Sequence, residues 1–522
     1  MAGILRELTF IQEREGWLPD AELREIALRL GVPLHRVESV STFYTHFRRR
    51  PPQGTELEVC RDVACRMAGN AEALRALESR LAAAGVAVHE TSCLGRCDGA
   101  PAAALGHRVV TLNDADAVVT SLSDSSVRER PQRRWSDALD AETRTPFVGL
   151  AALLARDPAS LIAVLEESGL RGMGGAGFPT ARKWSLVAAE SATSKHVICN
   201  ADESEPGTFK DREILHDLPH LVIEGMVLAG HCVGASRGTV FIRHEYEAER
   251  LRLTAAIEQA RQAGALGNDF DIDVFVSPGG YILGEETALL ECMEDRRGEP
   301  RNKPPFPGQR GLHGAPTLIN NVETFAHASC ILTNGVSWWR DLGVRGHAGH
   351  KFLSVSGDVA EPGVVLVPFG TTLGELLARC GGMKDGAALA AIAPGGASSL
   401  FLKADALDVP IDFDTLADAG SMLGSGAAIF VAEGRDLLEV GLDVARFFRN
   451  ESCGKCVPCR VGTEKAVKLV EDQSGAVDAT VEAKLRELHH TLERTSICGL
   501  GQVALAPLLS ILERFPSRPS DG

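Results

Sequence analysis

A tight group of cysteines near the C-terminal end constrains this 522-residue chain more than any other feature. Cys453, Cys456 and Cys459 are each separated by two residues, and Cys498 follows in the segment SICGLG. Thiolates at this spacing can wrap one face of a cubane cluster, and a distant fourth thiolate completes it. Structural zinc sites usually have separated pairs of ligands instead. The spacing predicts a [4Fe–4S] cluster, with zinc as the alternative.

A second group of cysteines lies near the N-terminus, where Cys60 and Cys65 are followed by Cys93 and Cys97. Cys60 ends a predicted strand, Cys65 begins a predicted helix, and the other two flank a turn. Backbone N–H groups at a helix start or a glycine stabilise thiolate sulfur. Such a ligand set on two loops suits a [2Fe–2S] cluster, although the spacing alone leaves a zinc site open.

Net charge and the distribution of apolar residues argue against several classes of protein. The net charge of −16 argues against a nucleic-acid partner, which normally requires a basic surface. No run of about 18 apolar residues occurs, so we expect no direct membrane insertion, and the polar N-terminus argues against a signal peptide. We therefore expect a cytoplasmic protein, in which cysteines favour metal binding over disulfides. The remaining cysteines are predicted to be small core residues: Cys199, Cys232, Cys292, Cys330 and Cys380.

The distribution of turns and apolar periodicity predicts a multidomain α/β protein. An N-terminal helical segment (1–50) precedes a small α/β unit, in which we expect a helix from about Met67 to Ala84. The largest unit mixes helices, strands and glycine-rich loops, and is followed by a compact α+β insert and a helical C-terminal unit. A polar linker contains the basic run 128–134, which we interpret as solvated rather than as a docking strip. The predicted ranges are 51–125, 126–145 for the linker, 146–350, 351–432 and 433–522.

The segment 171–184 is rich in glycine, and Gly172, Gly174 and Gly177 literally match GxGxxG. A dinucleotide-binding fingerprint should follow a strand, whereas this one follows a predicted helix with Asp157 as N-cap. It is therefore not an ordinary Rossmann motif. The glycines still allow close approach of a planar or phosphorylated ligand, with Lys183 supplying charge. A tight loop without a ligand is the alternative.

Polar clusters rich in Asn, Gly and acidic residues occur at 200–213, 284–291 and 320–324. Acidic residues at helix starts often only cap the helix dipole. Three such clusters in one domain favour a nucleotide-type cofactor, because acids accept ribose hydroxyls and amides satisfy ring edges or phosphate oxygens.

These segments resemble a known family. GMGGAGFPTxxKW, NADExEPGTFKDR, GYILGEETALLE, NKPPFP, INNVET and ESCGKCxPCRxGT are similar to the FMN-binding, NADH-oxidising subunit of respiratory complex I, over about residues 146–517. Residues 1–125 resemble the thioredoxin-like [2Fe–2S] companion subunit of that complex. The fusion of the two looks like the β (diaphorase) subunits of soluble NAD-dependent formate dehydrogenases and NAD-reducing hydrogenases.

The resemblance implies a thioredoxin-like domain, an FMN/NAD(H)-binding domain, a β-grasp-like domain of the soluble-ligand-binding type and a helical domain with the [4Fe–4S] cluster. It implies no covalent nucleophile, and it makes Glu205 and Lys183 positioning residues for hydride transfer. The implied FMN site comprises Gly172, Gly174, Lys183, Asn200, Asp202, Glu203, Ser204, Tyr281, Gly284, Glu285, Asn320, Asn321 and Thr324. The implied NAD(H) site comprises Phe178, Glu205, Glu286 and Phe306, with Lys183 shared.

This chain departs from the family pattern at two positions. Leu186 stands where many relatives have an aromatic residue, which would weaken adenine stacking. Met173 replaces a common arginine in the glycine loop, which would change the charge near the flavin. Neither departure removes an implied ligand.

The resemblance implies electron transfer between NAD(H), FMN and iron–sulfur clusters. The favoured partner is a catalytic α subunit, a molybdenum or tungsten formate dehydrogenase, whose electrons would reduce NAD+. A hydrogenase partner and a fused complex I subunit are alternatives. A binding and scaffold subunit with an inactive flavin site is the hypothesis of a different class.

Overall fold

The computed structural model describes residues 3–52, 54–106, 108–112, 118, 135, 144–473, 475 and 477–515. Most of the predicted linker, including the basic run 128–134, lies outside the described residues. Trp135 is described and is buried, with its ring 5.3 Å from that of Phe352 in an edge-on arrangement.

The N-terminal part combines helices with a small sheet, as expected. Its sheet has the strand order β2-β1-β3-β4, in which β1 and β2 are parallel and β3 and β4 run antiparallel to their neighbours. The elements are α1 (Ile4–Glu15), α2 (Asp20–Leu30), α3 (Leu34–Phe43), β1 (Thr55–Cys60), α4 (Val63–Met67), α5 (Asn70–Ala83), β2 (Val86–Thr91), β3 (Ala102–Leu105) and β4 (Arg108–Thr111).

The helix predicted from about Met67 is divided in two. Gly69 adopts φ 81°, a left-handed conformation that ends α4 and precedes α5. The main helix of this domain therefore starts at Asn70, and Cys65 lies in the short helix α4 after Cys60 ends β1. Cys60 and Cys65 therefore lie on one short segment, which runs from the end of β1 into α4.

A parallel sheet forms the centre of the largest domain, with the order β7-β6-β5-β8. Asp157 caps α8 by accepting a hydrogen bond from Ser160 N at 3.1 Å, as predicted. The strands are β5 (His196–Ala201), β6 (Arg237–Arg243), β7 (Asp271–Ser277) and β8 (Thr317–Asn321). The helices are α7 (Leu150–Leu154), α8 (Pro158–Ser168), α9 (Thr180–Ala189), α10 (Lys210–Asp217), α11 (Pro219–Val233), α12 (Glu247–Gln262), α13 (Glu286–Met293), α14 (Val322–Asn334) and α15 (Val336–Asp341).

The direction of these strands decides where the polar clusters meet. The clusters at 200–213, 284–291 and 320–324 follow the carboxyl ends of β5, β7 and β8 respectively. Carboxyl ends of parallel strands share one edge of a sheet, and ligands bind there in open α/β sheets. The fold thus gathers segments that are far apart in sequence at a single edge.

The α+β insert forms a mixed sheet of order β10-β9-β13-β11-β12. Only β9 and β13 pair in parallel, and the other neighbours are antiparallel. The elements are β9 (His350–Gly357), β10 (Gly363–Pro368), α16 (Leu373–Arg379), β11 (Leu389–Ala393), β12 (Leu402–Lys403), α17 (Phe413–Asp418) and β13 (Ala427–Ala432).

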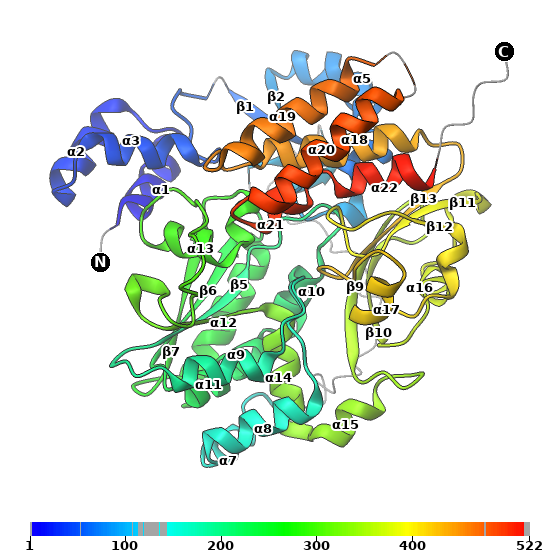
Figure 1. Ribbon diagram of the computed structural model, residues 1–522. Coiled ribbons are helices and arrows are strands. Elements are labelled where there is room, and N and C mark those ends of the chain that lie inside the picture. The colour runs from blue at the N-terminus through cyan, green and yellow to red at the C-terminus, as the bar shows by residue number, and fades with distance from the viewer. Residues whose placement is uncertain are drawn as a thin grey trace.

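The C-terminal part is helical and lies across the top of the sheet domains in Figure 1. Its helices are α18 (Leu437–Asn450), α19 (Val457–Glu471), α20 (Ala479–Thr495), α21 (Gly499–Val503) and α22 (Ala506–Arg514). One apolar cluster joins buried residues of α1 to α3, the central domain and α18 to α22. The domains therefore share cores instead of meeting only at polar surfaces.

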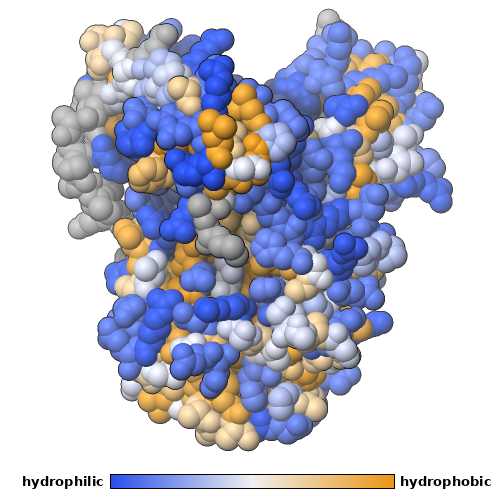
Figure 2. Space-filling model, turned by 90° about the vertical axis from the view of Figure 1, so that its left-hand side faces the viewer, coloured by the Kyte–Doolittle hydropathy of each residue, from blue (hydrophilic) through white to orange (hydrophobic). Residues whose placement is uncertain are grey.

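The face that carries α1 to α3 is mostly hydrophilic, with hydrophobic side chains in small separate groups (Figure 2). The most apolar long segment, α11, is a buried core helix of 15 residues. Among the described residues, no helix combines the length and the hydropathy needed to cross a membrane.

Candidate flavin, nucleotide and iron–sulfur sites

The cysteines of the C-terminal domain come from one loop and the starts of two helices. Cys453 lies in the loop after α18, Cys456 is the N-cap of α19, and Cys498 is the N-cap of α21. Cys459 follows in the first turn of α19. Helix N-termini stabilise negative charge, so this placement suits thiolate ligands.

Burial sets the chemistry of these thiols. It raises the pKa of Cys459 to about 11 and that of Cys498 to about 12, although backbone N–H groups of Gly501 and Leu500 lower the latter. The protein alone therefore keeps these thiols protonated at neutral pH. Bound iron supplies the positive charge that converts such thiols to ligands, so the donor set fits an iron–sulfur cluster.

The N-terminal cysteines form a chain of sulfur contacts. Cys60 contacts Cys65 and Cys93, and the Sγ atoms of Cys93 and Cys97 are 3.6 Å apart. Backbone N–H groups donate to two sulfurs, from Ala102 to Cys65 at 3.4 Å and from Gly207 to Cys97 at 3.3 Å. These N–H···S contacts are typical of iron–sulfur sites.

The zinc alternative requires donors about 2.0–2.3 Å from one point. Among the described residues, no group of three or more His, Cys, Asp or Glu side chains is placed to hold a metal ion. Hydrogen bonds from Cys60 and Cys97 and the charge of Arg243 hold the pKa of Cys93 well below its usual value.

The glycine loop packs tightly on the carboxyl end of β8. A Cβ atom on Gly174 would lie 2.9 Å from Cβ of Asn321, so a side chain there is excluded. The backbone N–H of Met173 donates to Oγ1 of Thr324 at 2.9 Å, and the Met173 side chain is buried in the core. Thr324 thus fixes the position of the glycine loop. The glycines of this loop have no side chains, so a ligand can approach the backbone closely at the sheet edge.

The three polar clusters contact one another at this edge. Nδ2 of Asn200 donates to the Gly284 carbonyl oxygen at 2.8 Å, which links the clusters that follow β5 and β7. Asn320 accepts a hydrogen bond from Trp184 Nε1 at 3.1 Å, which links β8 to α9. Asn321 caps α14 and its Nδ2 donates to Asp211 at 2.5 Å. The predicted flavin residues are therefore brought together.

Several predicted flavin residues have side chains already bonded within the protein. Asp202 accepts from Ser204 at 2.5 Å and from Ser277 at 2.8 Å, and burial raises its pKa to about 6. Glu203 accepts from the backbone N–H groups of Asp211 and Arg212, and burial raises its pKa to about 7. These side chains shape the segment, and their direct contact with a flavin stays a prediction.

The alternative that acidic residues of the 284–291 cluster cap a helix is confirmed for Glu285 and is wrong for Glu286. Glu285 caps α13 by accepting from the N–H groups of Thr287 and Ala288 at 2.9 Å each. Glu286 instead lies 3.5 Å from Lys183 Nζ and 3.0 Å from Lys303 Nζ. Burial would raise the pKa of Glu286, but the charges of these lysines outweigh it and hold the pKa below its usual value.

Two of the predicted NAD(H) residues have exposed aromatic rings. Phe178 is 39% and Phe306 is 54% exposed, and Leu186 is 55% exposed. Exposed rings suit stacking on adenine, and a paired carboxylate such as that of Glu286 suits hydrogen bonding to ribose.

Glu205 is held by a loop of the α+β insert. Its Oε1 atom accepts hydrogen bonds from Ser398 N at 2.9 Å and from Ser398 Oγ at 2.5 Å. Burial raises the pKa of Glu205, and the bonds from Ser398 partly offset this rise.

Sequence reasoning missed Lys303 and Ser398. The nearness of Lys303 to Phe306 in NKPPFP is a usable signal, whereas nothing local distinguishes Ser398.

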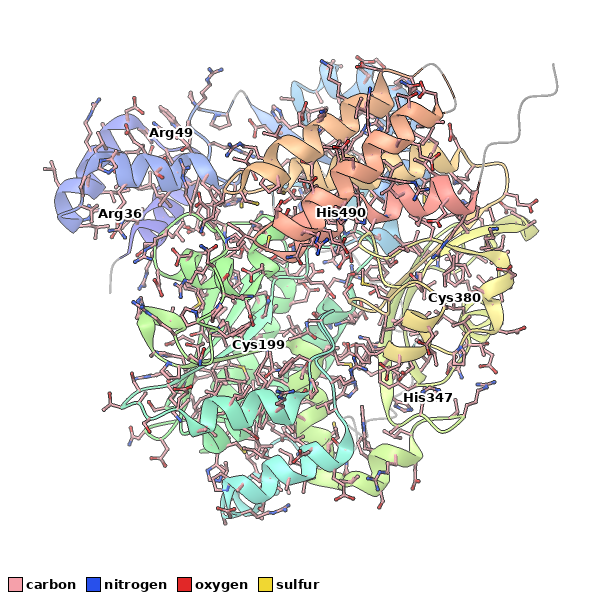
Figure 3. The ribbon with its side chains drawn as sticks, in the orientation of Figure 1. Arg36, Arg49, Cys199, His347, Cys380 and His490 are labelled. Carbon is pink, nitrogen blue, oxygen red and sulfur yellow. The ribbon has the colours of Figure 1, made fainter. Side chains whose placement is uncertain are left out.

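The other cysteines are core residues, as predicted. Cys199 lies on β5 in the central domain and Cys380 follows α16 in the α+β insert, well apart from each other (Figure 3). Cys199, Cys232, Cys292, Cys330 and Cys380 are all buried.

Family models match four parts of the chain. They are a thioredoxin-like [2Fe–2S] ferredoxin at 1–125, a Nuo51 FMN-binding domain at 165–329, an SLBB domain at 352–401 and an NADH-ubiquinone oxidoreductase-F iron–sulfur binding region at 439–520. These matches agree with the fold and support FMN, NAD(H), a [2Fe–2S] cluster and a [4Fe–4S] cluster as cofactors.

Curated relatives match the greater part of the chain. The HndC component of an NADP-reducing hydrogenase from Solidesulfovibrio fructosivorans is 39% identical over 378 residues, 71% of this chain and 77% of the relative. The F component of the NADH-quinone oxidoreductase of Escherichia coli is 39% identical over 405 residues, 74% of this chain and 90% of the relative.

A solved structure matches nearly the whole chain. An NAD+-reducing [NiFe]-hydrogenase in the H2-reduced state superposes with a TM-score of 0.89 and 30% identity, covering 98% of this chain and 92% of that one. The chain therefore belongs to the family of NAD(P)H-dependent flavin and iron–sulfur oxidoreductase subunits, with the thioredoxin-like [2Fe–2S] domain and the FMN-binding domain fused in one polypeptide.

Proposed function

We propose that this chain is the diaphorase subunit of a multisubunit enzyme, in which it exchanges hydride with NAD(H) and passes single electrons between FMN and its clusters. FMN supplies the link, because a flavin takes up hydride and releases electrons one at a time. The observation that carries the proposal is the meeting of the glycine loop and all three polar clusters at one sheet edge, between the two cysteine groups.

The residues of the chain have distinct roles in this proposal. Lys183 and Lys303 keep the Glu286 carboxylate charged, so that it can accept hydrogen bonds from ribose hydroxyls. Phe178 and Phe306 offer their rings to the adenine. Glu205, fixed by Ser398, limits where the nucleotide can lie. No covalent nucleophile takes part.

One carboxylate connects the proposed flavin site to both cysteine groups. Glu451, two residues before Cys453, accepts a hydrogen bond from Tyr281 N at 2.8 Å and one from the hydroxyl of Ser92, the residue before Cys93. The loops that hold the three proposed redox centres are therefore in direct contact, which supports electron exchange among them.

The C-terminal cysteine group lies close to the surface. Cys453, Cys456 and Cys498 are half-buried, and Val457 and Val461 on α19 are 59% and 52% exposed. Apolar side chains one turn apart beside a cluster form a face that a partner protein can cover. We propose that the catalytic partner, or a cluster protein joined to it, exchanges electrons here.

The identity of the partner is the finer part of the proposal. The match along nearly the whole chain is to a hydrogenase, which favours a hydrogen-oxidising partner. The formate-oxidising molybdenum or tungsten partner rests on the sequence resemblance alone and stays a prediction. A fused complex I subunit is the remaining alternative, since the relatives include a component of an NADH-quinone oxidoreductase.

The activity is tested with the purified chain reconstituted with FMN, iron and sulfide. NADH-dependent reduction of an artificial dye that requires FMN is the expected result. A fully reconstituted chain without this activity would contradict the proposal and favour the scaffold hypothesis. NAD+ reduction by the purified native assembly, with hydrogen and with formate in parallel, then identifies the partner.

A further inference from the structure

The loop that carries Cys93 and Cys97 is held mainly by other domains. The Cys93 carbonyl oxygen accepts a hydrogen bond from Arg243 Nη2 at 2.6 Å, and the Gly95 carbonyl oxygen accepts one from Arg212 Nη1 at 2.7 Å. Arg212 also pairs with Asp98 at 2.7 Å. Both arginines belong to the central domain with the β7-β6-β5-β8 sheet (hereafter the flavin domain), and both are buried.

Further contacts from outside the thioredoxin-like domain reach both ends of this loop. Glu451 bonds to Ser92 at its start, and the Gly207 N–H donates to the sulfur of Cys97. By contrast, the sulfur of Cys65 and the carbonyl of Cys60 are bonded to Ala102 N and Asn70 Nδ2 of their own domain. One half of the cysteine group is thus set by its own domain and the other half by the flavin domain.

Arg243 connects this loop to the proposed flavin site. It is the last residue of β6, its Nη1 atom donates to the Glu203 carbonyl oxygen, and its Nη2 atom donates to the Cys93 carbonyl oxygen. Its charge is paired with Glu245, at 2.6 Å from Nη2 and 3.0 Å from Nε. The Arg243 guanidinium therefore bonds to the backbone of both sites and also neutralises the half-buried Glu245 carboxylate.

We propose that Arg243 is a positioning residue of the [2Fe–2S] centre, which fixes the Cys93 side of the cluster against the flavin domain and thereby sets its reduction potential. The potential of an iron–sulfur cluster depends on local charge and on hydrogen bonds around its ligands. Loss of the guanidinium removes a positive charge that is bonded to the Cys93 carbonyl and leaves Glu245 with His244, at 3.3 Å, as its remaining partner. The net gain of negative charge near Cys93 disfavours the reduced cluster. The inference rests on the proposed assignment of this cluster to Cys60, Cys65, Cys93 and Cys97.

The test is an EPR-monitored redox titration of the full-length, cluster-loaded chain. In Arg243→Gln we expect a lower midpoint potential and a changed line shape for the [2Fe–2S] signal, with the [4Fe–4S] signal unchanged as an internal reference. Arg237→Gln is the matched control, because Arg237 begins the same strand but its side chain is 63% exposed. It should leave both signals as in the wild type.

A conservative variant keeps the test decisive. Arg243→Lys retains the charge but loses the planar fork that reaches both carbonyls, so we expect a smaller shift in the same direction. An unchanged potential and line shape in Arg243→Gln would overturn the inference. If Arg243→Gln fails to fold, the midpoint potential and line shape of Arg243→Lys are compared with those of the wild type instead, and no change in either would overturn the inference.

Failure of the underlying assignment gives a different result. In that case the wild-type chain would lack a [2Fe–2S] signal, or Cys93→Ser would retain it unaltered. A wild-type signal that Cys93→Ser abolishes and Arg243→Gln leaves unmoved would reject only the role of Arg243.

Discussion

The hydroxyl of Ser398 donates a hydrogen bond to Oε1 of Glu205 at 2.5 Å, across the boundary between the SLBB-type domain and the flavin domain. Ser398 N donates to the same oxygen at 2.9 Å. The proposed NAD(H) site thus depends on a domain that supplies none of the residues expected from the sequence motifs. The contact gives the SLBB-type domain a role in orienting a carboxylate of the flavin domain.

Ser398→Ala should weaken NADH binding and shift the pH dependence. An ordinary hydrogen bond contributes about 1 kcal/mol, and Ser398 N still donates to the same oxygen in the variant, so we expect KM for NADH to rise roughly 3- to 10-fold with a smaller change in kcat. Removing a donor that stabilises the carboxylate raises the pKa of Glu205 further, and the acidic limb of the pH–rate profile should move to higher pH. Steady-state dye reduction across pH measures both effects.

Ser421→Ala is the control for this prediction. Ser421 lies in the same domain and donates to the Leu400 carbonyl oxygen, so its loss loosens the same loop without removing a hydrogen bond to Glu205. Equal effects of the two variants would show that the Ser398 variant acts only through the stability of the domain.

Lys303→Gln should impair NADH binding most strongly at low pH. Without this lysine, Glu286 retains only Lys183 at 3.5 Å, so its pKa rises and the carboxylate protonates more readily. We expect KM for NADH to increase several-fold near pH 6 and less near pH 8. Lys384→Gln, at an exposed lysine of the SLBB-type domain, serves as control, and a pH-independent effect of Lys303→Gln would argue against the charge pairing.

Cys498→Ser should abolish the [4Fe–4S] signal and leave the [2Fe–2S] signal intact. Because the proposed ligands of the two clusters lie on separate loops, the iron content should fall by roughly four atoms per chain. Electron transfer to the partner should be lost, since the surface-proximal cluster is missing. Cys232→Ala, at a buried cysteine of α11, should retain both signals, and persistence of the [4Fe–4S] signal in Cys498→Ser would contradict the ligand assignment.

Lys351→Met should destabilise the chain by about 1–3 kcal/mol, because it removes one of the two lysines that neutralise the buried Glu323 carboxylate and leaves Lys210 Nζ, at 3.0 Å, as its remaining lysine partner. Nζ of Lys351 on β9 contacts Glu323 at the start of α14, and both side chains are fully buried. Chemical denaturation measures the loss. Arg345→Gln, which breaks an exposed pair with Glu375, should change stability little.

The same lysine gives a pH signature. Burial lowers the pKa of Lys351 from 10.5 to about 8 in the folded chain. Between these values the unfolded chain binds more protons on this residue, so its contribution to the free energy of unfolding increases with pH. The difference in stability between wild type and Lys351→Met should therefore grow from about pH 8 to 10.5. A constant difference would show that Lys351 titrates normally in the folded chain.

Local features of the chain are predictable, and the failures have physical causes. Asp157 is recognisable as the cap of α8 because a cap depends on residues three apart. The expected start of the main helix of the thioredoxin-like domain, near Met67, is too early, because the left-handed turn at Gly69 outweighs the helix-forming residues before it. Glu285 and Glu286 are identical neighbours in sequence and both pair with Lys303, yet Glu285 also caps a helix whereas Glu286 also pairs with Lys183.

The sequence by itself identified the two cysteine groups and the glycine-rich loop, and the resemblance of its motifs implied the kind of cofactor domain. A cysteine spacing or a run of glycines is set by covalent neighbours and is visible before folding. Only the tertiary structure decided which residues meet across domains, such as Arg243 with Cys93, Ser398 with Glu205 and Lys303 with Glu286. These contacts join residues far apart in the chain, and the direction of the parallel strands and the shared apolar cores bring them together.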